Sequence, residues 1–533
     1  MKASTLLKLI GLIVVVALGY AAYRLGWSVI EPKIDQRVAK IGLTPNQIAA
    51  NGPLPGDIGL YAKEMECQQK IPTPGYYSSL NGAEISDAQR SGLFPCASFL
   101  GARDGANTVY AWRSADDYPG ISYINNRKPG ELYIVGGEYP TLEDPNMAGP
   151  FVAKADATTG KQLWRTYLDN LNASGRWIGN ANLNILANGK IAFSWSNQIV
   201  LLDADTGAIL KHNTLPSGDA PAMDTNFKHM TIAPDGTLIM KDQTRPKGCT
   251  LQGTMAIIKC AAGEGMKQPN SQLVAVNPDT LEVLDDIQLP EPASSPHIVS
   301  MYEGRIAIIK CAAGEGMKQP NSQLVAVNPD TLEVLDDIQL PEPASSPHIV
   351  SMYEGRIAIY IGMDKSARRY FWDAETKKLS ADDSWVIYPM QEGQTTATAP
   401  SLVGDWIAFQ LNGAGSEKVA SSIVVANLKD ASRKQIIFPF GELKKGEWSF
   451  APPKCGADPE NNMIYSADMG VGKVAGIKLD PVSGELKVVF VLDDTTTTFQ
   501  PLFGPPDERV LVLTNMKRNV EKEPLKAALF TAN

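Results

Sequence analysis

Residues 156–164 read DATTGKQLW, and residues 203–210 read DADTGAIL. Such a stretch predicts a tight turn, because an Asp or Asn oxygen accepts hydrogen bonds from amides two residues on and Gly adopts a positive φ. Related turns recur about every 50 residues, each between short β-branched or aromatic runs. They begin at Asp156, Asp203, Asn277, Asn328, Asp373, Asn427 and Asp480. The recurrence predicts a repeated unit of strands.

A second piece, made of a strand, a tight turn and another strand, precedes these turns. Examples are NLNILANGKIAF (182–193), HMTIAPDGTLIM (229–240), HIVSMYEGRIAI (297–308 and 348–359) and SLVGDWIAF (401–409). Four strands per unit are typical of the blades of a β-propeller, and seven turns predict seven blades. An eighth blade is expected from 499–515, the C-terminal ALFTAN and a strand near 107–115, because pairing the chain ends removes free sheet edges.

One part of the repeat is identical rather than divergent. Residues 256–308 have the same sequence as residues 307–359, so 256–306 and 307–357 are two copies of one unit. Literal identity indicates either a very recent tandem duplication or an error in assembling the sequence, and both explanations stay open. The fold class expected for the chain as given is all-β, a propeller of eight four-stranded blades preceded by one N-terminal helix. Without the second copy, seven blades are expected.

Composition excludes several classes of protein. The chain of 533 residues is 44% hydrophobic and 20% charged, which is typical of packed globular domains and not of disordered chains. Its 49 basic and 58 acidic residues give a net charge of −9. Such a balance repels phosphate backbones, so nucleic acid is not expected as a partner.

The first 30 residues predict a membrane anchor or an export signal. Lys2 and Lys8 precede the uncharged run LIGLIVVVALGYAAY (9–23), which is shorter than the roughly 20 residues that span a bilayer. An uncleaved helix and a cleaved signal both stay open. We expect a signal anchor at 1–30, a Pro/Gly-rich stalk and irregular cap at 31–105, and the propeller at 106–533. The propeller would then lie in the periplasm, on a single-pass helix of the inner membrane or free after cleavage.

Six cysteines outside the cytoplasm are disulfide candidates. The expected pairs are Cys67 with Cys96 and Cys249 with Cys260. Cys311 copies Cys260 but has no copy of Cys249 near it, so it is expected to be an odd thiol. Spacing leaves a pairing of Cys311 with Cys455 open. The chain has no CxxCH, CxxC or His cluster, so neither covalent haem nor a metal site is predicted.

The stretch ADATTGKQLW (155–164) resembles the repeat of the pyrroloquinoline-quinone propeller superfamily, whose spacing is D-x-x-T-G-x-x-x-W. The matching residues are Asp156, Thr159, Gly160 and Trp164. The resemblance implies that the Trp packs between neighbouring blades. The copy at 202–210 keeps the Asp, Thr and Gly but lacks the Trp, and the other copies are more degenerate. Such a resemblance supports a fold and does not by itself give a function.

Members of that superfamily imply different functions. Quinone-dependent dehydrogenases need a calcium site of Asp, Asn and Glu, and many have adjacent cysteines, which this chain lacks. Pyrroloquinoline quinone with calcium is therefore disfavoured as a cofactor, although it stays open. Assembly scaffolds share the repeat without catalysis. Bacterial aryl sulfotransferases use histidines that converge on the central channel.

Three of the four histidines share one register. They stand seven residues before a turn glycine, at the start of a first strand, which lines the channel of a propeller. The candidate ligand-binding residues at this channel mouth are His229, His297 and His348, with Asn182 and Gln500 at similar positions in other blades and Lys228 and Arg245 beside His229, where Asp242 also lies. Imidazoles bind ligands and transfer protons, but wet channel mouths also carry polar residues at little cost. No catalytic residue is assigned.

These observations favour a membrane-anchored, extracytoplasmic propeller that binds a small molecule or a protein at its face. The alternative is a propeller enzyme, either an aryl sulfotransferase-like protein that uses the channel histidines or a quinone-dependent oxidoreductase. The sequence does not decide whether the protein is an enzyme.

Overall fold

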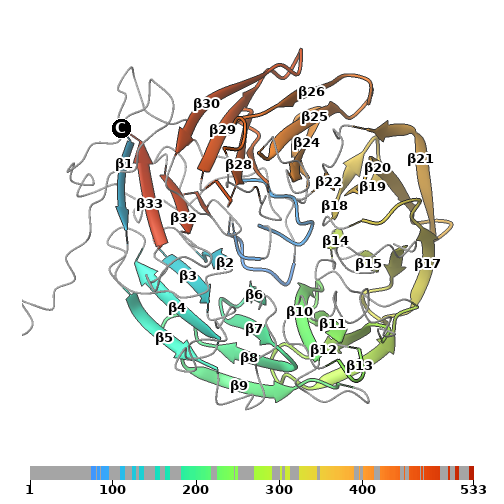
Figure 1. Ribbon diagram of the computed structural model, residues 1–533. Helices are drawn as coiled ribbons and strands as arrows, with labels where there is room; N and C mark the ends of the chain where they lie inside the picture. Colours follow the sequence, from blue (N-terminus) through green and yellow to red (C-terminus); the bar gives the residue numbers. More distant parts are fainter. Residues whose placement is uncertain are drawn as a thin grey trace, which may run out of the picture.

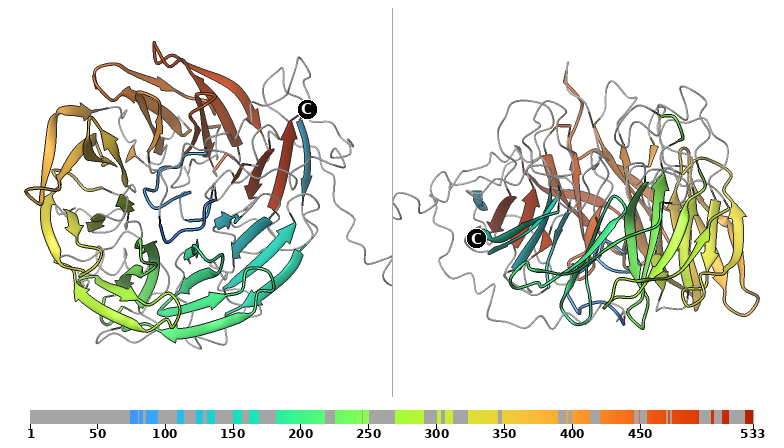
Figure 2. Two further views of the ribbon diagram at one scale, coloured as in Figure 1. Left: turned by 180° about the vertical axis from the view of Figure 1, so that it is seen from behind. Right: turned by 90° about the horizontal axis from the view of Figure 1, so that it is seen from below.

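The computed structural model describes residues 74–79, 81–83, 86–94, 109–113, 123–127, 131–136, 150–156, 162–168, 182–217, 225–244, 246–249, 269–290, 300–302, 306–311, 323–344, 348–388, 395–396, 400–412, 420–444, 449, 455–468, 470–471, 473–492, 502–503, 510–514 and 527–532. Within these residues the fold is all-β, and the strands form eight sheets. The sheets follow one another around a common centre in a closed ring (Figure 1). Figure 2 shows the same ring from behind and from below.

Four sheets occupy the first part of the ring. One contains β2 (Tyr123–Asn125), β3 (Glu131–Gly136), β4 (Phe151–Asp156) and β5 (Gln162–Tyr167). The next contains β6 (Asn182–Ile185), β7 (Ile191–Trp195), β8 (Gln198–Leu202) and β9 (Ile209–Thr214). It is followed by β10 (Thr225–Ile232), β11 (Leu238–Thr244), β12 (Gln272–Val276) and β13 (Val283–Gln288). The fourth contains β14 (Ser300–Tyr302), β15 (Ile306–Cys311), β16 (Gln323–Val327) and β17 (Val334–Gln339).

The remaining sheets complete the ring. One contains β18 (His348–Tyr353), β19 (Arg356–Gly362), β20 (Ala367–Asp373) and β21 (Lys378–Ile387). The next contains β22 (Thr395–Thr396), β23 (Ser401–Val403), β24 (Trp406–Asn412), β25 (Ser422–Asn427) and β26 (Lys434–Ile437), with both β22 and β23 paired to β24. It is followed by β27 (Gly456–Asp458), β28 (Met463–Asp468), β29 (Lys473–Leu479) and β30 (Leu486–Leu492). The last contains β31 (Leu502–Phe503), β32 (Val510–Thr514), β33 (Ala527–Ala532) and β1 (Val109–Arg113).

The two parts of the chain that were expected to close the ring are paired. Strand β1, near the beginning of the described chain, runs antiparallel to β33 at its end, from Val109 opposite Ala532 to Arg113 opposite Ala528. Strand β33 also pairs with β32. This sheet therefore joins the chain ends through backbone hydrogen bonds, which removes two free edges. None of the described residues belongs to a helix that is long and apolar enough to span a membrane, and residues 1–30 lie outside the described residues.

The Asp and Asn turns join the last two strands of seven sheets. In the turn between β8 and β9, Asp203 Oδ1 accepts hydrogen bonds from the amides of Asp205 (3.1 Å) and Thr206 (2.8 Å). The same contacts recur at Asn277, Asp373, Asn427 and Asp480. The expectation that Gly supplies the positive φ is only partly right. Gly207 and Gly484 do so, but Leu281, Leu332 and Lys377 adopt it elsewhere.

Neighbouring sheets pack face to face, and their middle strands form the core. All five residues of β8 are buried, for example, whereas most residues of the outer strand β9 are exposed. Tryptophan rings pack between neighbouring sheets at two places. Trp164 of β5 packs on Gly207, and Trp406 of β24 packs on Gly484 and donates from Nε1 to the carbonyl of Pro481 (2.9 Å). Packing of Trp164 between sheets is the role that the repeat resemblance implies.

Candidate functional site

The predicted channel-mouth residues lie on inner strands where they are described. Asn182 is the first residue of β6, His348 is the first residue of β18, and Lys228 and His229 lie in β10 beside a register shift. Strands β6, β10 and β18 are the innermost strands of their sheets (Figure 1). The side chains of Asn182, Lys228 and His229 are outside the described part. His297, Arg245 and Gln500 are wholly outside it.

His348 does not sit in the wet position expected of a channel mouth. Its side chain is fully buried. It pairs with Ile361, which belongs to the same core cluster as Val350 and Ile359. Since paired residues share a face of a sheet, the imidazole faces the core between two sheets. His348 is therefore buried and not exposed to solvent, and its role as a ligand-binding or sulfuryl-transfer residue stays a prediction.

Asp242 is also buried. It lies in β11 opposite Phe227, whose side chain is in the core. Its carboxylate accepts hydrogen bonds from the hydroxyl of Thr244 (2.6 Å) and the amide of Gln272 (2.5 Å). Burial raises the pKa of Asp242 to about 6, although these hydrogen bonds act in the opposite direction. The carboxylate therefore ties β11 to β12 and does not join a site at the mouth.

Part of the region expected to be a stalk and irregular cap crosses the centre of the ring. We call residues 74–94, described at 74–79, 81–83 and 86–94, the axial segment; it is blue in Figures 1 and 2. At its beginning, Tyr77 donates its amide to the carbonyl of Ile185 (3.0 Å), and the Gly75 carbonyl accepts from Ala187 (2.8 Å). The Tyr76 hydroxyl contacts Thr231 Oγ1 (2.9 Å). These bonds fasten the segment to β6 and β10.

The other end of the axial segment is fastened across the ring. The carbonyl of Gln89 accepts from the amide of Val350 in β18 (3.2 Å). Phe94 donates to the carbonyl of Ala457 in β27 (2.7 Å), and Ala457 donates to the carbonyl of Gly92 (2.9 Å). The segment thus links inner strands from opposite parts of the ring, and its backbone occupies the centre (Figure 1).

Glycine is required at both fastening points. Gly75 has φ +90° and Gly92 has φ +63°, a region that other residues enter at a cost. A Cβ at Gly92 would lie 2.5 Å from Ser401 Oγ and 2.6 Å from the Cys455 carbonyl. At Gly75 it would meet the carbonyl of Ala233. Sequence reasoning read these glycines as part of an irregular cap, since their contacts are distant along the chain.

Neutral amides are among the buried polar groups in and near the axial segment, together with the guanidinium of Arg90. Asn81 donates to the carbonyl of Ile124 (2.6 Å), and Asn125 donates to the carbonyl of Ala83 (3.0 Å). Asn226 is 1% exposed, and neither atom of its amide has a partner in the described part of the chain. Buried amides of this kind bind hydroxyl or amide groups, water included. They do not supply acid, base or nucleophile.

Within the described ranges, the residues around the centre gather no carboxylate cluster of the kind that calcium favours, and calcium with pyrroloquinoline quinone stays a prediction that is disfavoured by the sequence. Calcium takes six to eight oxygen ligands and favours carboxylates among them. No three His, Cys, Asp or Glu side chains gather to hold a metal within the described ranges. The buried polar side chains of the axial segment include the amides of Asn81 and Gln89 and the guanidinium of Arg90.

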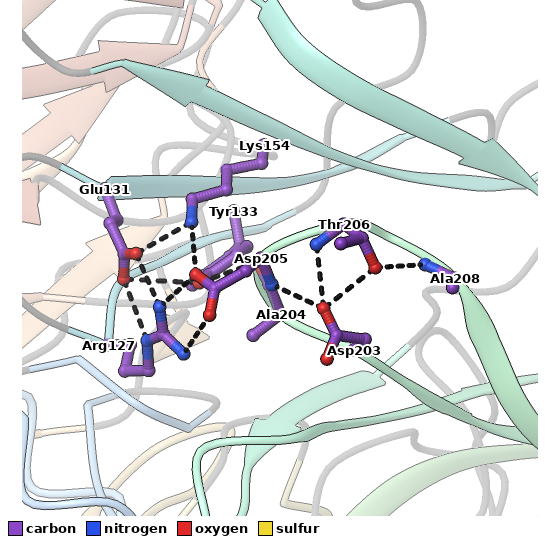
Figure 3. Close-up of polar contacts among 9 residues, drawn as sticks. All are labelled: Arg127, Glu131, Tyr133, Lys154, Asp203, Ala204, Asp205, Thr206 and Ala208. Carbon is purple, nitrogen blue, oxygen red and sulfur yellow. Dashed lines mark hydrogen bonds and ion pairs between the residues drawn. The ribbon is translucent and has the colours of Figure 1, made fainter.

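A charged cluster that the sequence analysis missed joins two sheets (Figure 3). Arg127 contacts Glu131 (2.8 Å) and Asp205 (2.5 Å), and Lys154 contacts the same two carboxylates (2.8 and 3.0 Å). The Tyr133 hydroxyl donates to Glu131 (3.2 Å). Asp205 belongs to the DADTG turn of the next sheet. The only sequence signal for this contact is the acidic residue inside that turn.

The charges of this cluster stabilise each other and thereby clamp the two sheets together. Hydrogen bonds from Arg127 and then Lys154 lower the pKa of Asp205 to about 2. Burial favours the protonated form of Glu131, but hydrogen bonds from Arg127 and Lys154 outweigh it and lower the pKa. Two cations and two anions neutralise each other, so no charge is left for a ligand. The cluster holds the β2–β5 and β6–β9 sheets together.

Two of the described cysteines, Cys249 and Cys455, bear on the disulfide predictions. Cys249 is disulfide-bonded, while Cys260, its expected partner, lies outside the described residues with Cys67 and Cys96. Cys455 is a free, buried thiol, and burial raises its pKa to about 12. A pairing of Cys455 with Cys311 is therefore excluded.

No protein-family profile matches the chain, and no curated protein matches its sequence. Among solved structures, a quinohemoprotein alcohol dehydrogenase from Pseudomonas putida HK5 is similar over 86% of this chain and 80% of its own, with TM-score 0.56 and 10% identity. One from Comamonas testosteroni is similar over 89% and 84%, with TM-score 0.52 and 13% identity. At such identities the likeness concerns fold alone. The chain therefore has a β-propeller fold, which it shares with these two structures.

Proposed function

We propose that this protein is an extracytoplasmic binding or scaffold propeller that engages a protein partner on the face around the axial segment. The observation that carries the proposal is the path of residues 74–94 across the centre of the ring. A ring whose centre holds its own chain offers a partner its faces and its wall, not a deep channel.

The proposal includes the layout expected from the sequence. Residues 1–30 anchor the protein in the inner membrane, residues 31–105 form the stalk and the cap that contains the axial segment, and residues 106–533 form the propeller in the periplasm. The alternative, a periplasmic protein released by cleavage, has the same propeller. The charged and then apolar N-terminus supports this layout.

We take the sheets to be blades, so that the propeller has eight. The eight sheets of the described residues support this number. Strands β16, β17 and β18 lie within the second copy of the duplicated unit, and strands β15 and β19 cross its two ends. A protein without that copy would have seven blades.

Site-specific photo-crosslinking in cells tests the proposed face. Ser78 is an exposed residue of the axial segment, and Val482, which is 79% exposed on a turn of the β27–β30 sheet, is the control position. A photoreactive residue at Ser78 should form one defined adduct with a protein that is absent from the Val482 variant. No adduct at Ser78, or the same adducts at both positions, would contradict the proposal.

A quinone-dependent oxidoreductase is the second candidate, because the two similar structures are quinohemoprotein alcohol dehydrogenases. An activity assay distinguishes this enzyme from the binding propeller. Purified protein incubated with pyrroloquinoline quinone and Ca²⁺ is mixed with a redox dye and primary alcohols. The binding propeller predicts no alcohol-dependent bleaching of the dye, and bleaching above that of a heat-denatured sample would favour the enzyme.

A further inference from the structure

Two outer strands of identical sequence have different surroundings. Strands β13 and β17 both read VLDDIQ. In β17, Asp336 is covered by the next sheet, where Lys378 contacts it (2.7 Å) and Leu379 donates its amide to it (2.7 Å). Its copy in β13, Asp285, is exposed, and so is Asp286. The aspartate that β21 covers in β17 is therefore exposed in β13.

Among the described strands, none pairs with the outer edge of β13, and none pairs with the outer edge of β9 in the neighbouring sheet. Strand β13 is the last strand of its sheet, and β9 is the last strand of the preceding one. Both follow the outer wall of the ring (Figure 1). Leu284 is 56% exposed, Ile209 41% and Leu210 43%. Unpaired edges with exposed apolar side chains are typical sites of strand addition by another chain.

We propose that β9 and β13 form a dimer interface with a second copy of this chain, in which β9 of each copy runs antiparallel to β13 of the other. Charge complementarity between the two strands favours a second copy of this chain as the partner. In the antiparallel pairing of ILKHNT with VLDDIQ, Lys211 lies opposite Asp286 of the second copy when Leu210 lies opposite Ile287. No ion pair among the described residues involves Lys211.

The two side chains face the same space. Asn213, on the face of β9 that carries Lys211, donates to the carbonyl of Leu281 in the next sheet (2.6 Å). Asp286 pairs with Val274, whose side chain packs in the core shared with the β6–β9 sheet. Lys211 and Asp286 therefore both point between these two sheets. A twofold axis through that space forms both Lys–Asp contacts at once, which an isologous dimer requires.

This inference goes beyond the proposed function and does not depend on it, because it concerns the outer wall and not the face. Analytical ultracentrifugation of the full-length chain tests it. The wild-type protein should be a dimer. Lys211→Glu and Asp286→Lys should each weaken dimerisation by roughly tenfold or more, because each replaces two attractive pairs with two repulsive ones.

An equimolar mixture of the two variants provides the decisive comparison. A heterodimer of Lys211→Glu with Asp286→Lys has opposite charges at both contacts, so mixing two monomers should restore the dimer. Asp337→Lys, which changes the copy of Asp286 in β17, is the matched control and should remain dimeric. A monomeric wild type, a mixture that stays monomeric, or an Asp337→Lys variant that dissociates as readily as Asp286→Lys would overturn the proposal.

Discussion

At the scale of single residues, Asp205 links a turn motif to the assembly of the ring. The turn places its carboxylate beside Arg127 and Lys154 of the neighbouring sheet. Both cations are nearly buried, with exposed side-chain fractions of 12% and 8%. A buried cation without an anion is costly, so each carboxylate of the cluster stabilises the ring through the partners that it neutralises.

Replacing the two carboxylates should have unequal effects. Asp205→Asn should cost about 1 kcal/mol, because the Asp205 side chain is 65% exposed and solvent screens its charge. Glu131→Gln, at an 8% exposed position, should cost about 3 kcal/mol. The pKa of Asp205 is lowered to about 2, so its contribution is present above about pH 4 and lost as the pH falls towards 2. Denaturant unfolding at several pH values checks both; equal losses, or a loss for Asp205→Asn that persists at pH 2, would contradict the clamp.

A second residue prediction concerns the packing of Trp164 on Gly207. Gly207 has φ +73°, and a Cβ there would lie 2.5 Å from the Trp164 ring. Gly355 has φ +77° with nothing within 4 Å, which makes it the matched control. Gly355→Ala should cost about 1 kcal/mol for its backbone, and Gly207→Ala about 2 kcal/mol more for displacing the ring. Unfolding midpoints that fall equally would show that the ring does not pack there.

The residue scale also shows where a sequence pattern reaches its limit. The turn chemistry of Asp203 and its relatives was readable because it is local. The positive φ of Leu281 was not, since the side chain is fully buried in the core and this burial offsets the backbone cost. The register of His348 was readable, but its burial depends on Ile361 and on the neighbouring sheet.

At the scale of elements, the strands were predictable and the axial segment was not. Short apolar runs between turn residues predicted β6, β7, β10, β11 and the strands that follow. The axial segment has no periodicity, and its partners lie far along the chain, as the bond from Phe94 to Ala457 illustrates. The sequence therefore predicted an irregular cap in this region, but it did not predict that the axial segment passes through the ring.

Loosening one end of the axial segment should expose its amides without unfolding the sheets. Gly92→Ala places a Cβ against Ser401 and Cys455, whereas Gly404→Ala, at φ +58° in open space, is the control. We expect Gly92→Ala to cost about 2 kcal/mol and to speed hydrogen exchange of residues 86–94. Mass spectrometry of exchanged peptides checks this. Equal exchange in the two variants would mean that Gly92 does not fasten the segment.

At the scale of the whole molecule, the chain closes by pairing β1 with β33, and it contains one unit twice. The closure follows from the sequence because unpaired ends would leave free edges. The different surroundings of β13 and β17 do not follow from it, because two identical strands receive different neighbours only once the ring is assembled. Identical local sequence thus gives identical strands but not identical surfaces.

Removing the second copy should leave a folded ring with one sheet fewer. Deletion of residues 307–357 joins Ile306 to Ala358, so that the sequence around the junction is the one that the intact chain has at 355–360. In a repeat architecture each unit contacts only its neighbours. The two sheets that meet after the deletion present the same strand sequences to each other as neighbouring sheets do in the intact chain. We expect a soluble protein with a single cooperative thermal transition, monitored by circular dichroism. An aggregated product or a broad, multiphasic transition would show that the ring cannot lose this unit.

The path of the axial segment through the ring is the central claim, and hydrogen exchange of the wild-type protein tests it most directly. The amides of Tyr77 and Phe94 are bonded to Ile185 and Ala457. Peptides that cover 74–79 and 86–94 should therefore exchange at least about a hundredfold more slowly than an unstructured chain. If these peptides exchange at the unstructured rate while β6 and β28 stay protected, the centre of the ring is not occupied by this segment.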